Sequence, residues 1–485
     1  MRLEVTNALN TLSTLTRQDS DNLQLVHCPE LLDVLLDLTV TTFESWKASS
    51  GIQSTAQGQD QGMGRFDHPA SRAQPSIFSR RDCFDTYQQL FEYSVDEACH
   101  LMECPSSAET AQGDTPELDA MSSTPTTSVH DRSSTKDLFL SVSNILRNLS
   151  FSPINFEFLA RYPRFLQVLK GTLLSIQMKG STRDVDMVDQ ERLHVGCSET
   201  KMEADSMDED VTEESADPRL GTKATESTRR IPSTWALTIL EHRKDILTIL
   251  ANLSGYLILP DSDSAQWIML LLLDFMNAQD TYYASLALEA VAKLGISHDN
   301  RMLLSNADRD LRMEAVKQRH GGRLPPRHLT HKVITGYTTE DVFEKWEEGG
   351  FLHPLFECLS GMLAKVLTMV TEQQSLAHIM PHSALAHLET LMLATYNLAV
   401  LSEADFRRYM VVQPGFVGGL LRLGVMLSDV RTPAYTSVGM RTVETLRVVS
   451  KDNEHLLVQY TEVIAKAAMQ PHIHPKVLDD LMCVL

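Results

Sequence analysis

Apolar residues recur three and four positions apart over most of the chain, which is the spacing of one buried face of an α-helix. The stretch "SNILRNLSFSPINFEFLARYPRFLQVL" at 143–169 is the clearest example. It carries two apolar helical stripes around a short break that contains Pro153 and Asn155. Sustained alternation of β-branched residues, the mark of strands, is scarce. The pattern predicts an all-α fold.

The apolar frame of this stretch recurs along the chain. Leu149 has Ile145 and Leu146 upstream, and we use it as an anchor for comparison. Similar frames centre on Leu15, Leu253, Leu294, Leu398 and Val449. The position after each anchor is small in all six copies, namely Thr16, Ser150, Ser254, Gly295, Ala399 and Ser450. A small residue there lets two helices approach closely.

The spacing of the anchors indicates a helical repeat. Anchors 253 and 294 are 41 residues apart, and anchors 398 and 449 are 51 apart. A period of about 40 residues is typical of helical solenoids. Turns with Asn or Asp follow several anchors, as in "SPINFEFL" and "SHDNRMLL", and we expect these side chains to start the next helix. The sequence therefore predicts an armadillo/HEAT-like solenoid, a stiff curved rod with one continuous core.

Long insertions interrupt the predicted repeats. One is rich in Gly, Gln and Ser, another is rich in Ser, Thr and Pro, and a third is acidic, with 13 Asp and Glu against 4 Arg and Lys between 181 and 220. Such compositions predict disorder. The expected organisation is a first repeat at 1–47, an insertion at 48–82, a solenoid helix at 83–104, an insertion at 105–134, a repeat at 135–179, an acidic linker at 180–232, repeats at 233–316, a basic loop and short helix at 317–350, and C-terminal repeats at 351–485.

Composition narrows the class of protein. With 485 residues, 43% of them hydrophobic, the chain can bury a large core, and its net charge of −21 argues against a protein that mainly neutralises phosphate. The seven cysteines are scattered without CxxC spacing, which suits a reducing compartment. The N-terminus has no secretory signal, and the densest apolar run, at 267–273, is far shorter than the roughly 20 residues of a membrane span. We expect a soluble intracellular protein that contacts no membrane.

Three anchors are preceded by asparagine, at Asn148, Asn252 and Asn397. In a helical-repeat groove, an asparagine at this position can hydrogen-bond the backbone of an extended bound peptide, which predicts partner binding. The alternative is that each asparagine ties neighbouring helices or a loop together.

Two charged stretches are candidate contact sites. The only concentrated basic segment is "KQRHGGRLPPRHLTHK", which predicts a patch that meets DNA phosphates, an acidic histone surface or another acidic partner; its residues are Arg319, His320, Arg323, Arg327, His328 and Lys332. The acidic run around Asp208–Asp210 could attract basic proteins. The alternative for both stretches is a solvated, charged spacer.

The sequence contains few motifs that are typical of catalytic or metal sites. The chain has no GxxxxGK[ST], GxSxG, HExxH or GxGxxG motif, so an enzyme and a cofactor are not expected. Histidines and cysteines occur together in three places, but none forms a closed four-ligand set at recognised spacing. These places are His472 with His474; Cys99 with His100 and Cys104; and His378 with His382 and His387. We therefore predict no metal and no small-molecule substrate.

Two stretches resemble a known family. "ILRNLSFSPINFEFLARYPRFLQVL" and "EVTNALNTLS…LVHCPELLDVLLDL" are similar to the C-terminal armadillo-like domain of the Osa family, the ARID-bearing subunit of SWI/SNF chromatin remodellers, in a fungal-like form. The resemblance covers residues 1 to about 178 best. No ARID-like domain precedes the repeats, so the expected chain is a fragment, a shortened product or a form without that half, and DNA binding by an ARID is not implied.

The resemblance implies a non-enzymatic nuclear scaffold for transcription regulation. Such a scaffold holds the ATPase and core subunits of a SWI/SNF complex together, and its contact with the nucleosome is indirect. The alternative is a cytosolic armadillo-repeat adaptor that binds extended peptides or ubiquitin and trafficking machinery.

Overall fold

The structure is a computed structural model that describes residues 2–18, 23–49, 129–174, 233–319, 350–372, 382–452 and 458–483. Within these ranges the regular elements are helices, together with one isolated antiparallel bridge between Asp429 and Ile473. The all-α fold predicted from apolar spacing is confirmed. The helices are α1 (Arg2–Gln18), η2 (Leu25–His27), α2 (Pro29–Ser49), α4 (Val129–Leu149), α5 (Pro153–Arg161), α6 (Pro163–Leu174), α7 (Ser233–Leu253), α8 (Ser262–Met276), α9 (Thr281–Leu294), α10 (His298–Arg319), α13 (Leu352–Glu372), α14 (His382–Leu401), α15 (Ala404–Val412), α16 (Phe416–Met426), α17 (Pro433–Ser450), η7 (Val458–Tyr460), α18 (Thr461–Ala468) and α19 (Pro475–Met482).

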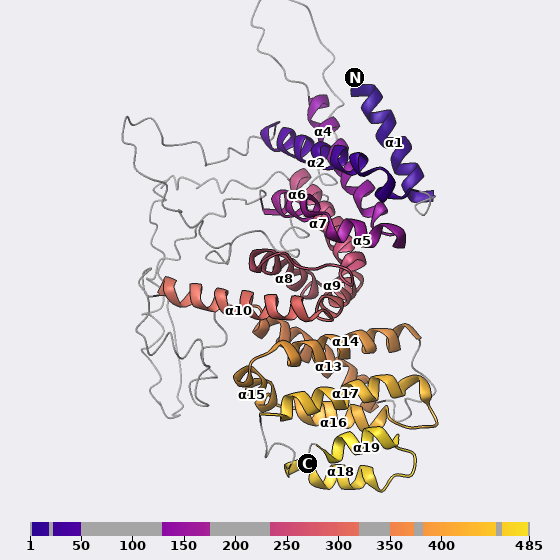
Figure 1. The fold of residues 1–485 in the computed structure, drawn as a ribbon, viewed down its shortest axis with the longest axis vertical. Coiled ribbons are helices and arrows are strands. Elements are labelled where there is room, and N and C mark those ends of the chain that lie inside the picture. The colour runs from indigo at the N-terminus through magenta and orange to yellow at the C-terminus, as the bar shows by residue number, and fades with distance from the viewer. Residues whose placement is uncertain are drawn as a thin grey trace, which may run out of the picture.

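The helices stack into an elongated rod, with the N-terminal helices at one end and the C-terminal helices at the other (Figure 1). One row runs through the whole stack in the order α1, α4, α7, α9, α14 and α17, each helix packed against the next. We call it the anchor row, because each of its helices contains an anchor. Helices α2, α8, α13, α16 and α19 pack against this row, which gives the stacked arrangement of a helical-repeat solenoid.

The anchors explain why the stack has one continuous core. Leu149, Leu253, Leu294, Leu398 and Val449 are each at most 1% exposed, and all belong to a single hydrophobic cluster that extends from α1 to α19. Burying an apolar side chain of this size stabilises the fold by about 1.5–3 kcal/mol. The prediction is wrong for Leu15, which is 51% exposed. Helix α1 is first in the row, so the outer side of Leu15 has no neighbouring helix in the described part of the chain.

Local signals set several helix starts. The Asp261 carboxylate accepts the Ser264 N–H at 2.6 Å at the beginning of α8, and Asp280 accepts the Tyr282 N–H at 2.9 Å at the beginning of α9. These bonds satisfy backbone donors that the helix itself cannot use. Proline occupies the first turn of α5, α17 and α19, where its missing N–H costs nothing.

Two predicted boundaries are wrong. Helix α4 begins at Val129, inside the stretch 105–134 that its Ser/Thr-rich composition assigned to a loop. Helix α10 continues to Arg319, beyond 316, and the Gly-Gly pair at 321–322 follows it in the sequence. The predicted solenoid helix at 83–104, the insertion at 48–82 beyond Ser49, and the acidic linker at 180–232 lie outside the described residues.

Helix α14 is long and apolar enough to cross a membrane by length and composition. It lies within the anchor row, packed between α9 and α17, and Leu391, Met392, Leu398 and Ala399 are buried there. These contacts are those of a core helix of the stack.

Candidate interaction surface and the polar contacts that shape it

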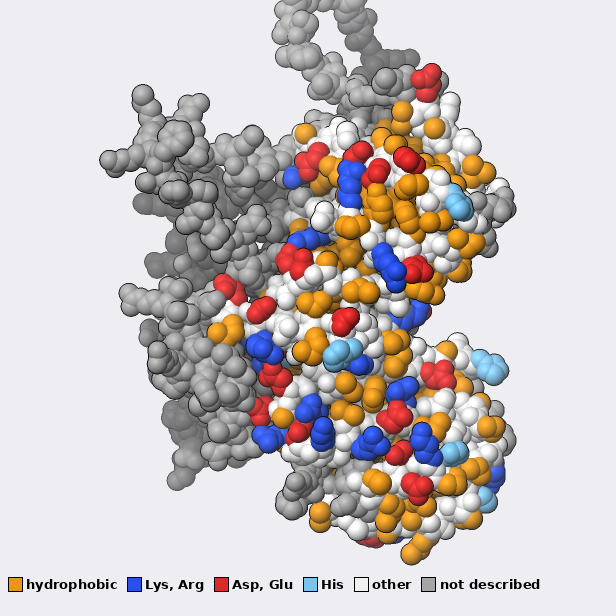
Figure 2. Space-filling view, viewed as in Figure 1, with side chains coloured by type: hydrophobic (Ala, Val, Ile, Leu, Met, Phe, Trp, Pro, Cys, Tyr) orange, Lys and Arg blue, Asp and Glu red, His pale blue; other side chains and the backbone are white. Residues whose placement is uncertain are grey.

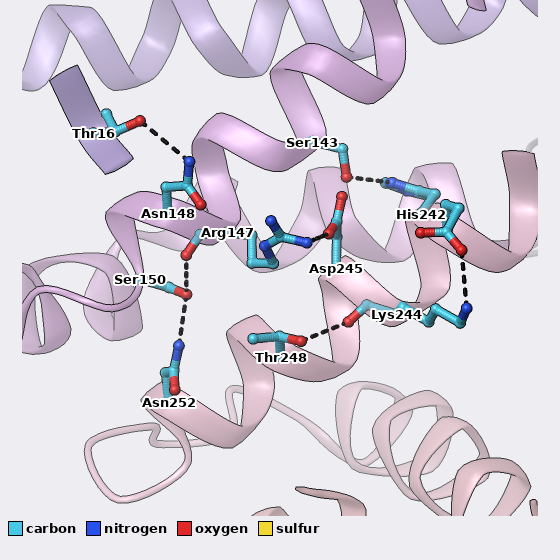
Figure 3. Close-up of polar contacts among 11 residues, drawn as sticks. Thr16, Ser143, Arg147, Asn148, Ser150, His242, Lys244, Asp245, Thr248 and Asn252 are labelled. Carbon is cyan, nitrogen blue, oxygen red and sulfur yellow. Dashed lines mark hydrogen bonds and ion pairs between the residues drawn. The ribbon is translucent and has the colours of Figure 1, made fainter. Parts of the chain in front are cut away.

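The three predicted asparagines lie where helices of the anchor row meet. Asn252 of α7 donates from Nδ2 to the Ser150 hydroxyl at 3.0 Å, and Asn148 of α4 lies 3.5 Å from the Thr16 hydroxyl (Figure 3). Asn397 of α14 donates to the Ala292 carbonyl at 2.7 Å. Each amide therefore reaches back to the preceding helix of the row. This is the arrangement that the alternative interpretation, ties between neighbouring helices, describes.

The small residue after each anchor has a specific neighbour. Thr16 and Ser150 directly follow anchors and receive the amides of Asn148 and Asn252. Gly295 also follows an anchor, and a Cβ added there would lie 2.7 Å from the Cβ of Asn397. A larger side chain at Gly295 would collide with the asparagine of the next helix, which accounts for the glycine there, whereas Thr16 and Ser150 supply hydroxyl groups to their asparagines.

These contacts leave little surface of Asn148 and Asn397 for a partner, while Asn252 is partly exposed. Asn148 is 7% exposed and Asn397 is 4% exposed. Hydrogen bonding of a bound peptide by the three asparagines stays a prediction. Of the predicted basic patch, Arg319 is the last residue of α10, whereas Arg323, Arg327 and Lys332 lie outside the described residues, as do His320, His328 and the acidic run at 208–210.

A polar cluster that the sequence reasoning missed lies between α4 and α7 (Figure 3). His242 is 1% exposed; its Nδ1 lies 2.9 Å from the Ser143 hydroxyl, and its Nε2 lies 2.9 Å from the Thr172 hydroxyl. Burial, together with the neighbouring Arg243 charge, lowers the pKa of His242 to about 3. The imidazole is therefore neutral at physiological pH, with both nitrogens satisfied by hydroxyl groups.

An ion pair lies beside this histidine. Arg147 Nη1 donates to Asp245 Oδ1 at 2.7 Å, and the Asp245 side chain is only 8% exposed. Burial raises the pKa of Asp245 to about 6, and the attraction of Arg147 offsets only part of that effect. The signal for the cluster is the polar run "EHRKD" at 241–245, which interrupts an otherwise apolar helix. The cluster joins consecutive helices of the stack and lies away from solvent, which is unlike an open catalytic site.

Two further asparagines hold extended segments of the preceding repeat. Asn155 accepts the Leu25 N–H at 2.9 Å and donates to the Leu23 carbonyl at 2.9 Å. Asn300 accepts the Leu259 N–H at 2.9 Å and donates to the Leu257 carbonyl at 2.7 Å. Each therefore forms the same two-bond clamp, six positions after its anchor. The expectation that these side chains start helices is wrong, since both lie in the first turn of a helix and bind another segment's backbone.

A buried aspartate performs a related task at the end of the predicted basic loop. Asp308 is fully buried in α10, and its Oδ1 accepts the Phe351 and Leu352 N–H groups at 2.8 and 2.9 Å. Its Oδ2 pairs with Arg312 Nε at 2.9 Å. The carboxylate thereby fixes the start of α13 against α10.

Exposed apolar side chains gather around α5. Phe151, Ile154, Tyr256 and Ile258 are each about half exposed, and the Tyr256 ring lies 5.6 Å from that of Phe156. Figure 2 shows hydrophobic side chains concentrated over this end of the rod, where α2 and α5 lie. A groove opens beside them, lined by Tyr162, Pro163, Leu166, Ile258 and Pro260 among others. Surface apolar groups bordered by charge are typical of protein interaction sites.

The described residues contain no cluster of three or more His, Cys, Asp or Glu side chains that could hold a metal. His472 and His474 lie on either side of Ile473 in the isolated bridge, and His382 and His387 lie in the first turns of α14. Cys99, His100, Cys104 and His378 are outside the described residues.

Comparison with models of known protein families gives a match over part of the chain. Residues 137–318 match the model of a family described as SWI/SNF-like complex subunit BAF250/Osa. The resemblance indicated by "LRNLSF" is confirmed there, and the match extends through α7–α10, further than expected, while residues 1–136 lie outside it. No curated protein matches the chain.

Proposed function

Because residues 137–318 match the model of the BAF250/Osa family of SWI/SNF-like complex subunits, we propose that the chain is a non-enzymatic scaffold that holds the ATPase and core subunits together. The family acts in chromatin remodelling and transcription regulation, which supports the nucleus as the proposed site of action. The family match is the observation that carries the proposal.

The fold supports a scaffold in two ways. A solenoid whose repeats share one core resists bending, so it can hold several partners at fixed distances. The buried polar contacts between α4 and α7, and the asparagine ties along the anchor row, join each repeat to its neighbour. Indirect contact with the nucleosome is part of the proposal.

Purification of the tagged full chain from nuclear extract tests the scaffold. We expect mass spectrometry to identify a remodeller ATPase and its core subunits in stoichiometric amounts. A tagged unrelated armadillo protein from the same extract controls for non-specific capture. Recovery of the chain without any remodeller subunit would overturn the proposal.

A cytosolic peptide adaptor is not favoured by the family match. The two functions are separated by replacing Asn148, Asn252 and Asn397 together. Loss of an extended peptide ligand in a variant that still folds would favour the adaptor. Because these amides bond to neighbouring helices, we expect reduced stability instead.

The basic stretch supplies a second proposed contact. If residues 317–332 bind DNA phosphates or an acidic partner, replacing Arg323, Arg327 and Lys332 by Gln will weaken nucleosome binding of the assembled complex and reduce its salt dependence. Subunit composition should stay unchanged, which separates this contact from the scaffold.

A further inference from the structure

The exposed apolar surface around α5 includes Ile258, whose backbone segment is held in place by hydrogen bonds to Asn300. In the segment after α7, Leu257 and Leu259 are each 2% exposed, whereas Ile258 between them is 52% exposed. Asn300 binds the Leu257 carbonyl and the Leu259 N–H, so the extended conformation that turns Ile258 outward is fixed. An outward apolar side chain on a clamped segment loses little further entropy when it binds a partner.

The groove beside Ile258 connects two repeats. Its walls come from the α5–α6 corner, with Tyr162 and Leu166, and from the segment that ends at Pro260. Phe151, Ile154 and Tyr256 extend the apolar surface beyond the groove. Together these side chains offer a recess for one apolar side chain and a flat apolar area next to it, a form that suits an inserted peptide or helix.

The border of this surface carries more negative than positive charge. Its basic residues are already paired: Arg161 with Glu157 at 2.9 Å, Arg164 with Asp33 and Asp37, and Lys170 with Asp263. Asp261 lines the groove, and Glu30 of α2 is close enough to act electrostatically on Tyr162. The Tyr162 hydroxyl donates to Asp33 at 2.8 Å, and that bond, with the nearby carboxylates, raises the pKa of Tyr162. Arg161 and Lys170 line the groove itself, each in its ion pair, and the named side chains in and around the groove together supply six carboxylates against three cations.

We propose that this groove docks a basic amphipathic segment of another subunit of the complex. One apolar side chain enters between Tyr162, Leu166 and Ile258, and flanking Lys or Arg residues meet Glu30, Asp33 and Asp261. The inference rests on the proposed scaffold function and names the partner's chemistry at one surface. A second copy of this chain fits poorly, because two acidic borders facing each other repel.

Site-specific photo-crosslinking in the full chain tests the groove. A photoreactive phenylalanine analogue replaces Ile258 in one tagged chain and Ile296 in a control chain, since Ile296 is similarly exposed, at 55%, on a turn of the next repeat. Both chains are expressed in the native cells and purified with the complex after irradiation. We expect position 258 to crosslink to one remodeller subunit at least about tenfold more than position 296.

The sequence of the crosslinked partner peptide tests whether the partner is apolar and basic, as proposed. We expect a large apolar residue with Lys or Arg within a few positions, and a lower yield when Glu30→Lys is combined with the probe at 258. Equal yields at 258 and 296, a peptide without cationic residues, crosslinks only to a second copy, or an unchanged yield with Glu30→Lys would each overturn the proposal. In all four results the remodeller subunits still co-purify, whereas failure of the scaffold function would remove them. Melting curves of each variant exclude misfolding.

Discussion

The Asn252 side chain donates a hydrogen bond to the Ser150 hydroxyl at 3.0 Å and thereby joins α7 to the end of α4. Ser150 in turn donates to the Arg147 carbonyl at 2.7 Å, so the hydroxyl serves as both acceptor and donor. Asn148 and Asn397 occupy the same position in their own helices, one residue before an anchor, and also reach the preceding helix of the row. These contacts make the asparagines part of the stack's internal bonding.

Replacing Asn397 by Ala removes one of these ties. The lost hydrogen bond to Ala292 and the lost packing against Gly295 should lower the free energy of unfolding by about 1–2 kcal/mol. Urea denaturation of the full chain measures the change. Asn10→Ala is the control, because Asn10 is exposed in α1 and its replacement mainly improves helix propensity. Equal stability of the two variants would contradict the structural role.

Gly295→Ala should destabilise the protein by about 1–3 kcal/mol, because the added methyl would collide with Asn397 and the contact is fully packed. Its φ of −74° is accessible to alanine, so the cost is steric. Gly171→Ala is a matched control in α6, where a Cβ would meet nothing within 4 Å. We expect that variant to be more stable by about 0.5–1 kcal/mol. Thermal melting compares the two variants. A change in Tm of the same sign in both would argue against the close contact between Gly295 and Asn397.

The fold was largely predictable because apolar spacing and anchor frames are local features of the sequence. Leu149, Leu253, Leu294, Leu398 and Val449 are buried as those frames predict. Leu15 has the same frame and is exposed, because burial depends on whether another helix covers that side. The start of α4 at Val129 and the end of α10 at Arg319 were also not predicted, since composition alone does not fix the residue at which a helix begins or ends.

The polar contacts were harder to predict. The sequence shows an asparagine before three anchors and a small residue after each, but it does not show that they meet across repeats. Asn148 and Thr16 are 132 positions apart, and Asn155 holds Leu25 from 130 positions away. Only the stacking of the helices brings such pairs together. The groove beside Ile258 has the same origin, since its two walls come from different repeats.

Asn155→Ala should loosen the segment that leads into α2. Without the side chain, the buried Leu25 N–H and the Leu23 carbonyl lose their partner, at a cost of about 1–3 kcal/mol. Hydrogen exchange at the Leu25 amide should accelerate by one order of magnitude or more. Asn155→Asp keeps the acceptor for that amide and loses only the donor to Leu23, so Leu25 should stay better protected in it. Similar exchange rates in the two variants would contradict the clamp.

The pH dependence of stability should reveal His242 and Asp245 as opposing groups. In the folded protein His242 has a pKa of about 3 and stays neutral, whereas in the unfolded chain the imidazole binds a proton below its ordinary pKa of 6.5. The contribution of His242 to the free energy of unfolding therefore rises as the pH rises from about 3 to 6.5. Asp245 has a raised pKa of about 6, so the folded state binds the extra proton and its contribution falls with pH between about 4 and 6. In the wild type the two opposing slopes of stability against pH nearly cancel between about pH 4 and 6.

Asp245→Asn should leave a free energy of unfolding that rises with pH by up to about 1.4 kcal/mol per pH unit, and His242→Gln should make it fall with pH instead. Urea denaturation between pH 4 and 7 measures these profiles. Other titrating groups are common to all three proteins and cancel in the differences, so parallel profiles would show that neither group is perturbed by burial.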